Sequence, residues 1–391
     1  MTINVHHGDC RDVLAAIPAG FAHCCVTDPP YGFRFMGRRW DYDVPPVATW
    51  RAVHRVLRPG AYLVAFGGPR TGHRIATAIE DAGFELRDSL AWLFGEGMPK
   101  SQDIAKAIDK ALGVKGEKRP TGEKRNRIAP GATILSTGDW HAGGGEYEPH
   151  DYIPATDQAR EWLGWGTGLK PGHEPIVLAR KPAESRNIAR NVLAHGTGAL
   201  NIGACRVPID DADAGGRWPA NVLHDGSAEV VELFPEAQGM ARGVLRRGAT
   251  TGRGIGFAST SEGHEVVAGY GDKGSAARFF YSAKATDADR ADSKHPTVKP
   301  VALIRWLVRL VTPRGGMILD PFAGSGTTGE AAMLEGFDAT LIEREAEHVA
   351  EISHRIARWN GGDLPLFNGD APQAAEDVPL PLFVAPQFAL T

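Results

Sequence analysis

The sequence predicts an α/β fold in which a mostly parallel, doubly wound sheet is interrupted by a long insertion. Short apolar segments alternate with segments of helical period over the first hundred residues, and the same alternation returns after residue 296. The region between these two parts is rich in Gly, Pro and Asn and has few clean periods. Strands that alternate with helices of this length are typical of a parallel sheet covered on both faces.

The elements of the N-terminal part follow from apolar runs and from the residues that end them. We expect strands over 3–9, 22–28, 58–68 and 84–95, and helices over 10–18, 47–57 and 72–83. The strand over 22–28 must end at its two prolines, because proline cannot donate a hydrogen bond to a sheet ladder. The sequence at this point reads "VTDPPYG".

The C-terminal part repeats the rhythm. We expect helices over 299–311, 326–336 and 347–360, and strands over 315–322 and 337–345. The predicted units are therefore an N-terminal half of the main domain (1–98), an insertion (99–285), a second half of the main domain (286–360) and a disordered, Pro-rich tail (361–391).

Composition narrows the class of protein. A net charge of -4 argues against a protein that coats nucleic acid by bulk charge, but it leaves room for a local basic cleft. The N-terminus has no signal-peptide layout and no apolar run is long enough for a membrane span, so we expect a cytoplasmic protein. Cys10, Cys24, Cys25 and Cys205 form no CxxC pair, so we expect free thiols and no metal site.

A glycine-rich turn follows the predicted strand that ends at Asp320. Gly324, Ser325 and Gly326 precede a helix, where glycines allow close approach of a ligand and the helix N-terminus offers free N–H groups. The spacing departs from GxGxxG and from GxxxxGK[ST], which argues against dinucleotide and triphosphate sites. Glu343 ends the next strand, where an acidic residue can take ribose hydroxyls; the alternative is a glutamate that caps the following helix. We expect a ribose-bearing cofactor.

The two strand ends, "DPPY" and "DPFAGSGT", together resemble those of the DNA amino-methyltransferases that use S-adenosyl-L-methionine. The order, with DPPY first, the insertion next and the glycines last, is similar to the β class of this family. The segment "HHGDC", with Asp9, is similar to the family's acidic contact near the adenine of the cofactor, and "KHPTVKP" is similar to the motif that precedes the cofactor strand and helps hold the methionine end. The segments "GWGTGLKPGHEPIVLARKP" and "HGTGALNIGACRV" are similar to segments of phage and prophage members of the family. The resemblance implies a Rossmann-like methyltransferase fold with a seven-stranded sheet, in a bacterial or phage-encoded restriction-modification context, and a target-recognition role for the insertion.

Catalytic roles come with this resemblance for four residues. Asp28 and the carbonyl of Pro29 would accept the two N–H groups of an exocyclic amine and aim its lone pair at the methyl group. Pro29 and Pro30 would stiffen the loop, and Tyr31 would stack on the base. The base has to leave the duplex to reach such a site, so base flipping is implied.

The cofactor residues that the resemblance implies are Asp9, Cys10, Asp28, Thr297, Lys299, Asp320, Phe322, Ala323, Gly324, Ser325, Gly326, Thr327, Glu343 and Arg344. Arg34, Arg38, Arg39 and Trp40 follow DPPY and suit DNA contact; folding of this loop onto the core is the equal alternative.

Aspartate in the first position of DPPY resembles adenine-N6 enzymes, so the prediction is adenine, with cytosine-N4 as the alternative. A hypothesis of a different functional class is a non-catalytic DNA-binding protein that has kept the methyltransferase fold.

Duplex DNA is the expected partner, and a homodimer stays open. Two LPLF copies, at 364–367 and 380–383, resemble sliding-clamp peptides, although compositional bias of the tail is the favoured explanation.

Overall fold

The structure is a computed structural model of the chain. It describes residues 1–33, 41–95, 97, 101–126, 146–208, 215–237, 243–245, 266–268, 274–283, 289, 293 and 298–360. The predicted DNA contacts Arg34, Arg38, Arg39 and Trp40, the predicted cofactor residue Thr297 and the tail lie outside these residues. Among the helices described, none combines the length and apolar character needed to cross a membrane.

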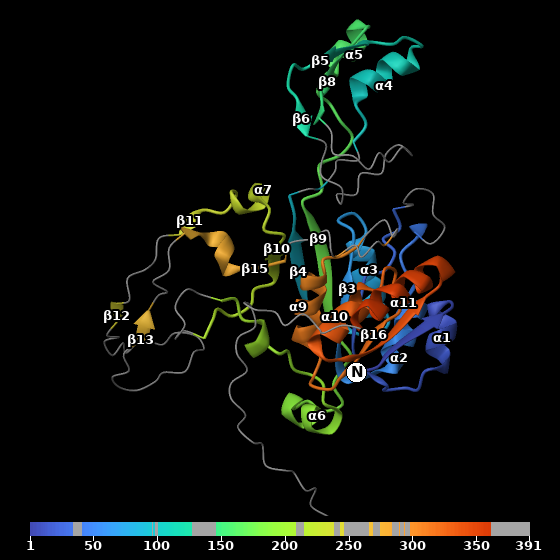
Figure 1. Ribbon diagram of the computed structural model, residues 1–391, viewed down its shortest axis with the longest axis vertical. Helices are drawn as coiled ribbons and strands as arrows, with labels where there is room; N and C mark the ends of the chain where they lie inside the picture. The colour runs from blue at the N-terminus through green and yellow to red at the C-terminus, as the bar shows by residue number, and fades with distance from the viewer. Residues whose placement is uncertain are drawn as a thin grey trace, which may run out of the picture.

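A nine-stranded sheet in the order β1-β17-β16-β2-β3-β9-β4-β10-β15 forms the body of the molecule (Figure 1). Its strands are β1 (Ile3–His7), β2 (Ala22–Thr27), β3 (Leu57–Phe66), β4 (Glu85–Leu93), β9 (His173–Arg180), β10 (Val222–His224), β15 (Tyr281–Ser282), β16 (Met317–Asp320) and β17 (Asp338–Glu343). All neighbours pair in parallel except β9, which is antiparallel to both β3 and β4. The predicted α/β class is confirmed, and the sheet has nine strands where seven were expected.

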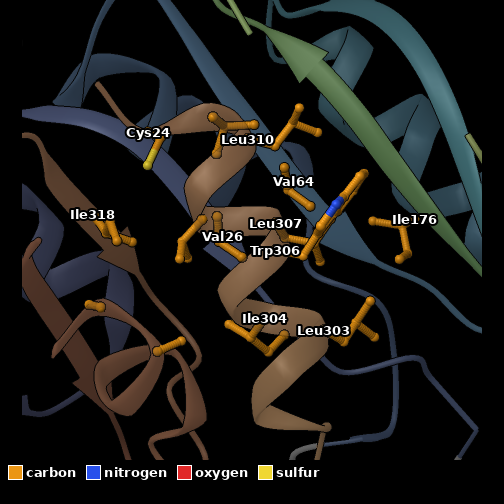
Figure 2. Close-up of a cluster of buried hydrophobic side chains, with 14 of the residues drawn as sticks. Cys24, Val26, Val64, Ile176, Leu303, Ile304, Trp306, Leu307, Leu310 and Ile318 are labelled. Carbon is orange, nitrogen blue, oxygen red and sulfur yellow. The ribbon is translucent and has the colours of Figure 1, made fainter. Parts of the chain in front are cut away.

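Helices cover both faces of this sheet. The helices of one face are α1 (Cys10–Ala16), α2 (Val47–Val56) and α3 (Gly72–Asp81); those of the other are α9 (Val301–Val311), α10 (Thr327–Glu335) and α11 (Ala346–Asn360). Alternating side chains of β2 divide between the two layers, since Cys24 and Val26 pack under α9 whereas Cys25 packs toward α1 and α2. Figure 2 shows the layer under α9, in which Leu307 of α9 and Val26 of β2 belong to one cluster of buried side chains.

Ends of the helices agree with local sequence signals. Asp9 caps α1 by accepting a hydrogen bond from the Arg11 amide at 2.9 Å. Gly336, with φ 78°, ends α10 in the left-handed conformation that glycine adopts without strain. Each expected helix and strand of the two main-domain halves is found within a few residues of its predicted bounds.

The predicted insertion contributes to the main sheet as well as forming structure of its own. Strands β9, β10 and β15 fall inside 99–285 but pair within the nine-stranded sheet. Strand β9 reverses direction and follows a Gly- and Pro-rich stretch rather than a helix, so the alternation of strands and helices did not reveal it. Cys24, Cys25 and Cys205 are buried free thiols, as predicted, and Cys10 is a half-buried one.

The remaining elements of the insertion are short. They are α4 (Ile104–Ala111), β5 (Glu117–Pro120), β6 (Arg125–Asn126), β7 (Glu146–Tyr147), β8 (His150–Ile153), α5 (Asp157–Glu161), α6 (Ile188–His195), η3 (Gly203–Cys205), α7 (Ala228–Val231), β11 (Glu236–Ala237), β12 (Gly243–Leu245), β13 (Val266–Ala268), β14 (Gly274–Ser275) and η5 (Ala276–Phe279). Elements α4, β5, β8 and α5 form a small unit at the top of Figure 1. Asp109 joins its parts by accepting hydrogen bonds from Tyr152 Oη at 2.8 Å, Ala155 N at 2.8 Å and Thr156 Oγ1 at 2.7 Å.

Helix α9 should account for a large share of the core stability. Leu307 has no exposed surface, and we expect Leu307→Ala to lower the free energy of unfolding by about 2–5 kcal/mol through lost burial and a residual cavity. Leu193→Ala on α6, where the side chain is 86% exposed, is the matched control and should change it by less than about 0.5 kcal/mol. Urea unfolding of both variants measures the difference, and equal losses would contradict the packing described.

Candidate active site

Strand ends from both halves of the chain meet at one edge of the sheet and line a cavity of about 1700 Å³. Because β1, β2, β16 and β17 run parallel, their carboxyl ends lie at the same edge, where α/β sheets bind ligands. The predicted site residues that line this cavity are Asp9, Cys10, Asp28, Pro29, Pro30, Tyr31, Lys299, Asp320, Phe322, Ala323, Gly324, Ser325, Thr327, Glu343 and Arg344. Gly326 is not among its lining residues and instead forms the N-cap of α10.

The ends of β2 and β16 are joined directly. Thr27 Oγ1 donates a hydrogen bond to Asp320 Oδ1 at 2.6 Å, and Phe322 N donates to the same oxygen at 3.1 Å. Asp320 is 2% exposed, and burial raises the pKa of its carboxyl to about 6 against the opposing effect of these donors. A carboxylate buried among neutral donors favours a positively charged group in the cavity beside it.

The glycine turn is shaped by its backbone and by Glu343. Gly324 has φ 51° and Gly326 has φ 80°, both in the left-handed region. A Cβ atom on Gly326 would lie 3.0 Å from Ile352 Cγ1, so this position also needs glycine for space. Glu343 accepts the Gly324 amide at 2.8 Å with Oε2 and the Glu345 amide at 2.8 Å with Oε1. Glu343 thus fixes the turn, while the predicted ribose contact stays a prediction.

A buried ion pair contacts the backbone of this turn. Arg355 of α11, 1% exposed, pairs with the buried Glu330 of α10 and donates from Nε to the Ser325 carbonyl at 2.8 Å. Sequence patterning did not single out either residue, because each has the appearance of an ordinary charged residue on a helix. The pair bears on the site because Arg355 holds the backbone of the glycine turn at Ser325.

Asp9 and Cys10 lie at the end of β1, on the far side of the cavity from β2. The carboxylate of Asp9 forms an ion pair with Arg11 at 3.1 Å, and hydrogen bonding from Arg11 lowers the pKa of Asp9. Burial raises the pKa of the Cys10 thiol to about 11, so the group is neutral near pH 7. The predicted contact of Asp9 with an adenine ring stays a prediction.

Asp41 holds the loop that follows DPPY, and sequence analysis missed it. Its Oδ1 accepts the amides of Tyr31 and Gly32, each at 2.8 Å, and its Oδ2 accepts the amide of Phe33 at 3.1 Å. Asp41 is only 3% exposed. Three amides on one carboxylate fix the backbone of the loop, so the position of the Tyr31 ring is set before any ligand binds.

The ammonium group of Lys299 contacts the carboxylate of Asp28 in DPPY. Its Nζ is 2.8 Å from Asp28 Oδ2 and 3.2 Å from Glu174 Oε2, and it donates to Tyr31 Oη at 3.2 Å. The Tyr31 hydroxyl in turn donates to Asp28 Oδ1 at 2.7 Å. Burial lowers the pKa of Lys299, but the nearby Asp28 and Glu174 outweigh burial and raise it overall. The structure therefore brings the predicted Lys299, Asp28 and Tyr31 together and adds Glu174.

A model of the DNA methylase family of N6 and N4 amino-methyltransferases matches residues 22–354, which is most of the chain and includes both halves of this cavity. The chain belongs to this DNA methylase family. Membership implies S-adenosyl-L-methionine as the methyl donor.

Individual relatives are distant. The Type II methyltransferase M.HindIII of Haemophilus influenzae is 24% identical over 280 residues, covering 71% of this chain and 57% of that protein. The chain thus spans little more than half the length of this curated relative. The M1.HpyAVI–SAM complex has a TM-score of 0.41 and 14% identity over 91% of this chain and 99% of that one. The cytosine-N4-specific PvuII DNA methyltransferase has a TM-score of 0.44 and 15% identity over 91% and 87%. The family assignment rests on the family model and not on these likenesses.

The chemistry of the cavity fits the family's cofactor. A sulfonium and an ammonium group are cationic, and the cavity is lined at the end of β16 by the carboxyl group of Asp320, whose hydrogen-bond donors Thr27 and Phe322 are neutral. Ribose hydroxyls suit a carboxylate such as Glu343 at a strand end, beside a turn that opens a helix. The predicted cofactor residues Gly324, Ser325, Glu343 and Asp9 all line this cavity, and their contacts with a cofactor stay predictions.

The raised pKa of Asp320 has a measurable effect on stability. Because its folded-state pKa of about 6 exceeds the usual 3.8, the folded state holds this proton more tightly. Its contribution to stability is greatest below pH 4 and falls as the pH rises through 6. We expect Asp320→Asn to be more stable than the wild-type apoprotein at pH 7, by up to about 3 kcal/mol.

Urea unfolding of both proteins between pH 4 and 7 measures this difference. The advantage of the variant should grow with pH across that range. A difference that does not change with pH would show that the carboxyl of Asp320 ionises normally in the folded protein.

Proposed function

We propose that the protein transfers a methyl group from S-adenosyl-L-methionine to the N6 amine of an adenine flipped out of duplex DNA at a specific sequence. The observation that carries the proposal is the junction of β2 and β16, where Thr27 Oγ1 lies 2.6 Å from Asp320 Oδ1. This junction puts DPPY and the glycine turn on the same cavity.

Asp28 supplies the grip on the amine. The nitrogen of an aromatic amine is a poor nucleophile because its lone pair is delocalised into the ring. Accepting N–H hydrogen bonds at Asp28 and at the Pro29 carbonyl favours a pyramidal nitrogen with its lone pair directed out of the ring. Asp28 Oδ1 already accepts the Tyr31 hydroxyl but has a second lone pair for the amine, since each carboxylate oxygen can accept twice.

Preorganisation of the loop supports this role. Pro29 and Pro30 restrict the backbone, Asp41 binds three successive amides, and the Tyr31 hydroxyl is tied to Asp28. The acceptors are therefore in place before the base arrives, and no reorganisation is needed during the reaction. Tyr31 would stack on the base, a contact worth about 1–3 kcal/mol.

When bound, S-adenosyl-L-methionine supplies an electrophilic methyl carbon on a sulfonium sulfur. The methyl group would pass to the amine nitrogen that Asp28 and Pro29 hold, and the electron pair of the broken carbon–sulfur bond would stay on sulfur. The carboxylate of Asp28 would accept the proton that the nitrogen loses. Alignment of the two reactants in one cavity is the main contribution of the chain.

Residues of the insertion extend the same cavity. Thr167, Gly168, Leu169 and Lys170 line it together with Phe94 of the main domain. This continuity supports a role of the insertion in reading duplex DNA, with the base turned out of the helix to reach Asp28. The DNA contacts of the loop 34–40, the homodimer and the clamp peptides stay predictions.

Cytosine-N4 methylation is the second candidate. The two amines present the same N–H groups to Asp28 and Pro29, so the acceptors alone do not select the base. The aspartate of DPPY favours adenine by resemblance. A non-catalytic DNA-binding protein is disfavoured because a site without turnover has no use for the preorganised acceptors of Asp28 and Pro29.

A direct assay tests the proposal. The purified chain is incubated with radiolabelled S-adenosyl-L-methionine and mixed-sequence duplex DNA, and the DNA is digested to nucleosides. The proposal predicts label in N6-methyladenine. Label in N4-methylcytosine would reassign the base, and absence of label in DNA would contradict the enzymatic function.

Two variants separate the amine grip from the cofactor turn. Asp28→Ala removes the main acceptor and should lower kcat by at least about 100-fold with cofactor affinity nearly unchanged. Gly324→Val places a β-branched side chain at φ 51° beside the cavity and should abolish cofactor binding. Isothermal titration with the cofactor and initial rates measure the two effects, and near-wild-type turnover of Asp28→Ala would refute its role.

A further inference from the structure

One ammonium group lies between two carboxylates at the centre of the cavity. Lys299 Nζ contacts Asp28 Oδ2 at 2.8 Å, Glu174 Oε2 at 3.2 Å and Tyr31 Oη at 3.2 Å. The Tyr31 hydroxyl also lies 2.7 Å from Asp28 Oδ1 and 3.4 Å from Glu174 Oε2. These four side chains, which we call the Lys299 ring, form a closed set of polar contacts.

Glu174 reaches this ring because of the reversed direction of β9. Strands β3 and β4 end at the cavity edge, and antiparallel pairing brings the first residues of β9 to the same edge. The Glu174 side chain is only 19% exposed, and burial raises its pKa against the opposing effect of Lys299. Burial of a charged carboxylate costs free energy unless the carboxylate is paired, and the partner of Glu174 is Lys299.

Lys299 can use all three of its N–H donors within the ring. An ammonium has three donors and no acceptor, and its three oxygen partners come from Asp28, Glu174 and Tyr31. Its position is further limited by the faces of two aromatic rings, Tyr31 at 5.5 Å and Phe66 at 5.0 Å. Without Glu174, Asp28 would be the only carboxylate in contact with the Lys299 ammonium. The ammonium would then move closer to Asp28 and occupy the carboxylate that the amine needs.

We infer that Glu174 is a positioning residue for methyl transfer, which holds Lys299 so that the ammonium fixes one oxygen of Asp28 and leaves the other to the amine. This inference rests on the proposed function and adds a residue to it. The two carboxylates and one ammonium also leave the ring with a net negative charge next to the nitrogen that becomes positive on methylation.

Glu174→Gln tests the inference in the full chain, with S-adenosyl-L-methionine and mixed-sequence duplex DNA as substrates. The amide keeps the shape of the side chain and removes its charge. We expect kcat to fall by about 10- to 100-fold, because Asp28 is displaced, while KM for the cofactor changes by less than about twofold. Glu85→Gln is the matched control, because Glu85 pairs with Arg180 at the opposite end of β9 and should leave kcat unchanged.

A double-mutant cycle distinguishes positioning from general damage. If Glu174 acts through Lys299, Glu174→Gln should change kcat by less than about twofold in a Lys299→Met background. Equal losses in both backgrounds, or wild-type kcat for Glu174→Gln, would overturn the inference. Cofactor binding by isothermal titration reports folding of each variant; should Glu174→Gln not fold, Glu174→Asp replaces it, with the same loss of kcat expected from its shorter reach.

The activity of the wild-type protein distinguishes failure of the proposed function from failure of the role of Glu174. A wild-type protein that transfers no label to DNA overturns the proposed function and this inference together. An active wild type with an unaffected Glu174→Gln variant overturns the role of Glu174 alone.

Discussion

The parallel pairing of β2 with β16 is the contact on which the site depends. It aligns Cys24 with Ile318 and Cys25 with Leu319, residues almost three hundred positions apart in the chain. Because parallel strands end at the same edge, this register brings DPPY beside the glycine turn, and the hydrogen bond from Thr27 to Asp320 closes the junction. The burial of both strands under α9 keeps the register fixed, since a slip of one residue would turn every side chain to the wrong face.

Charge inside the cavity is balanced by partners from distant segments. Lys299 lies just before α9 and contacts Asp28 at the end of β2, whereas Arg355 of α11 contacts Glu330 of α10 next to the glycine turn. Such buried pairs contribute little net stability, but loss of one partner is expensive. They therefore act as constraints that hold the DPPY loop and the glycine turn in one arrangement. Asp320 differs, because its protein partners are neutral and its raised pKa leaves a place for a cationic ligand group.

Features that depend on a local sequence pattern could be predicted from the sequence. The strands that end at Asp28, Asp320 and Glu343 could be predicted from apolar runs and from the prolines and glycines that stop them, and the structure puts all three on one cavity. Two other features depend on long-range geometry. Glu174 begins a reversed strand instead of ending a parallel one, and Asp41 reaches back to amides ten residues earlier. Neither has a spacing or a composition that distinguishes it from other acidic residues.

We propose that Asp28 and Pro29, at the end of β2, bind an adenine amine in DNA. Single-molecule sequencing of DNA from cells that express the chain tests it most directly, because it reads the modified base and its sequence context together. We expect N6-methylated adenines at one short sequence with the wild-type protein and none with Asp28→Ala. Unmodified DNA from wild-type cells, or equal modification with both proteins, would contradict it.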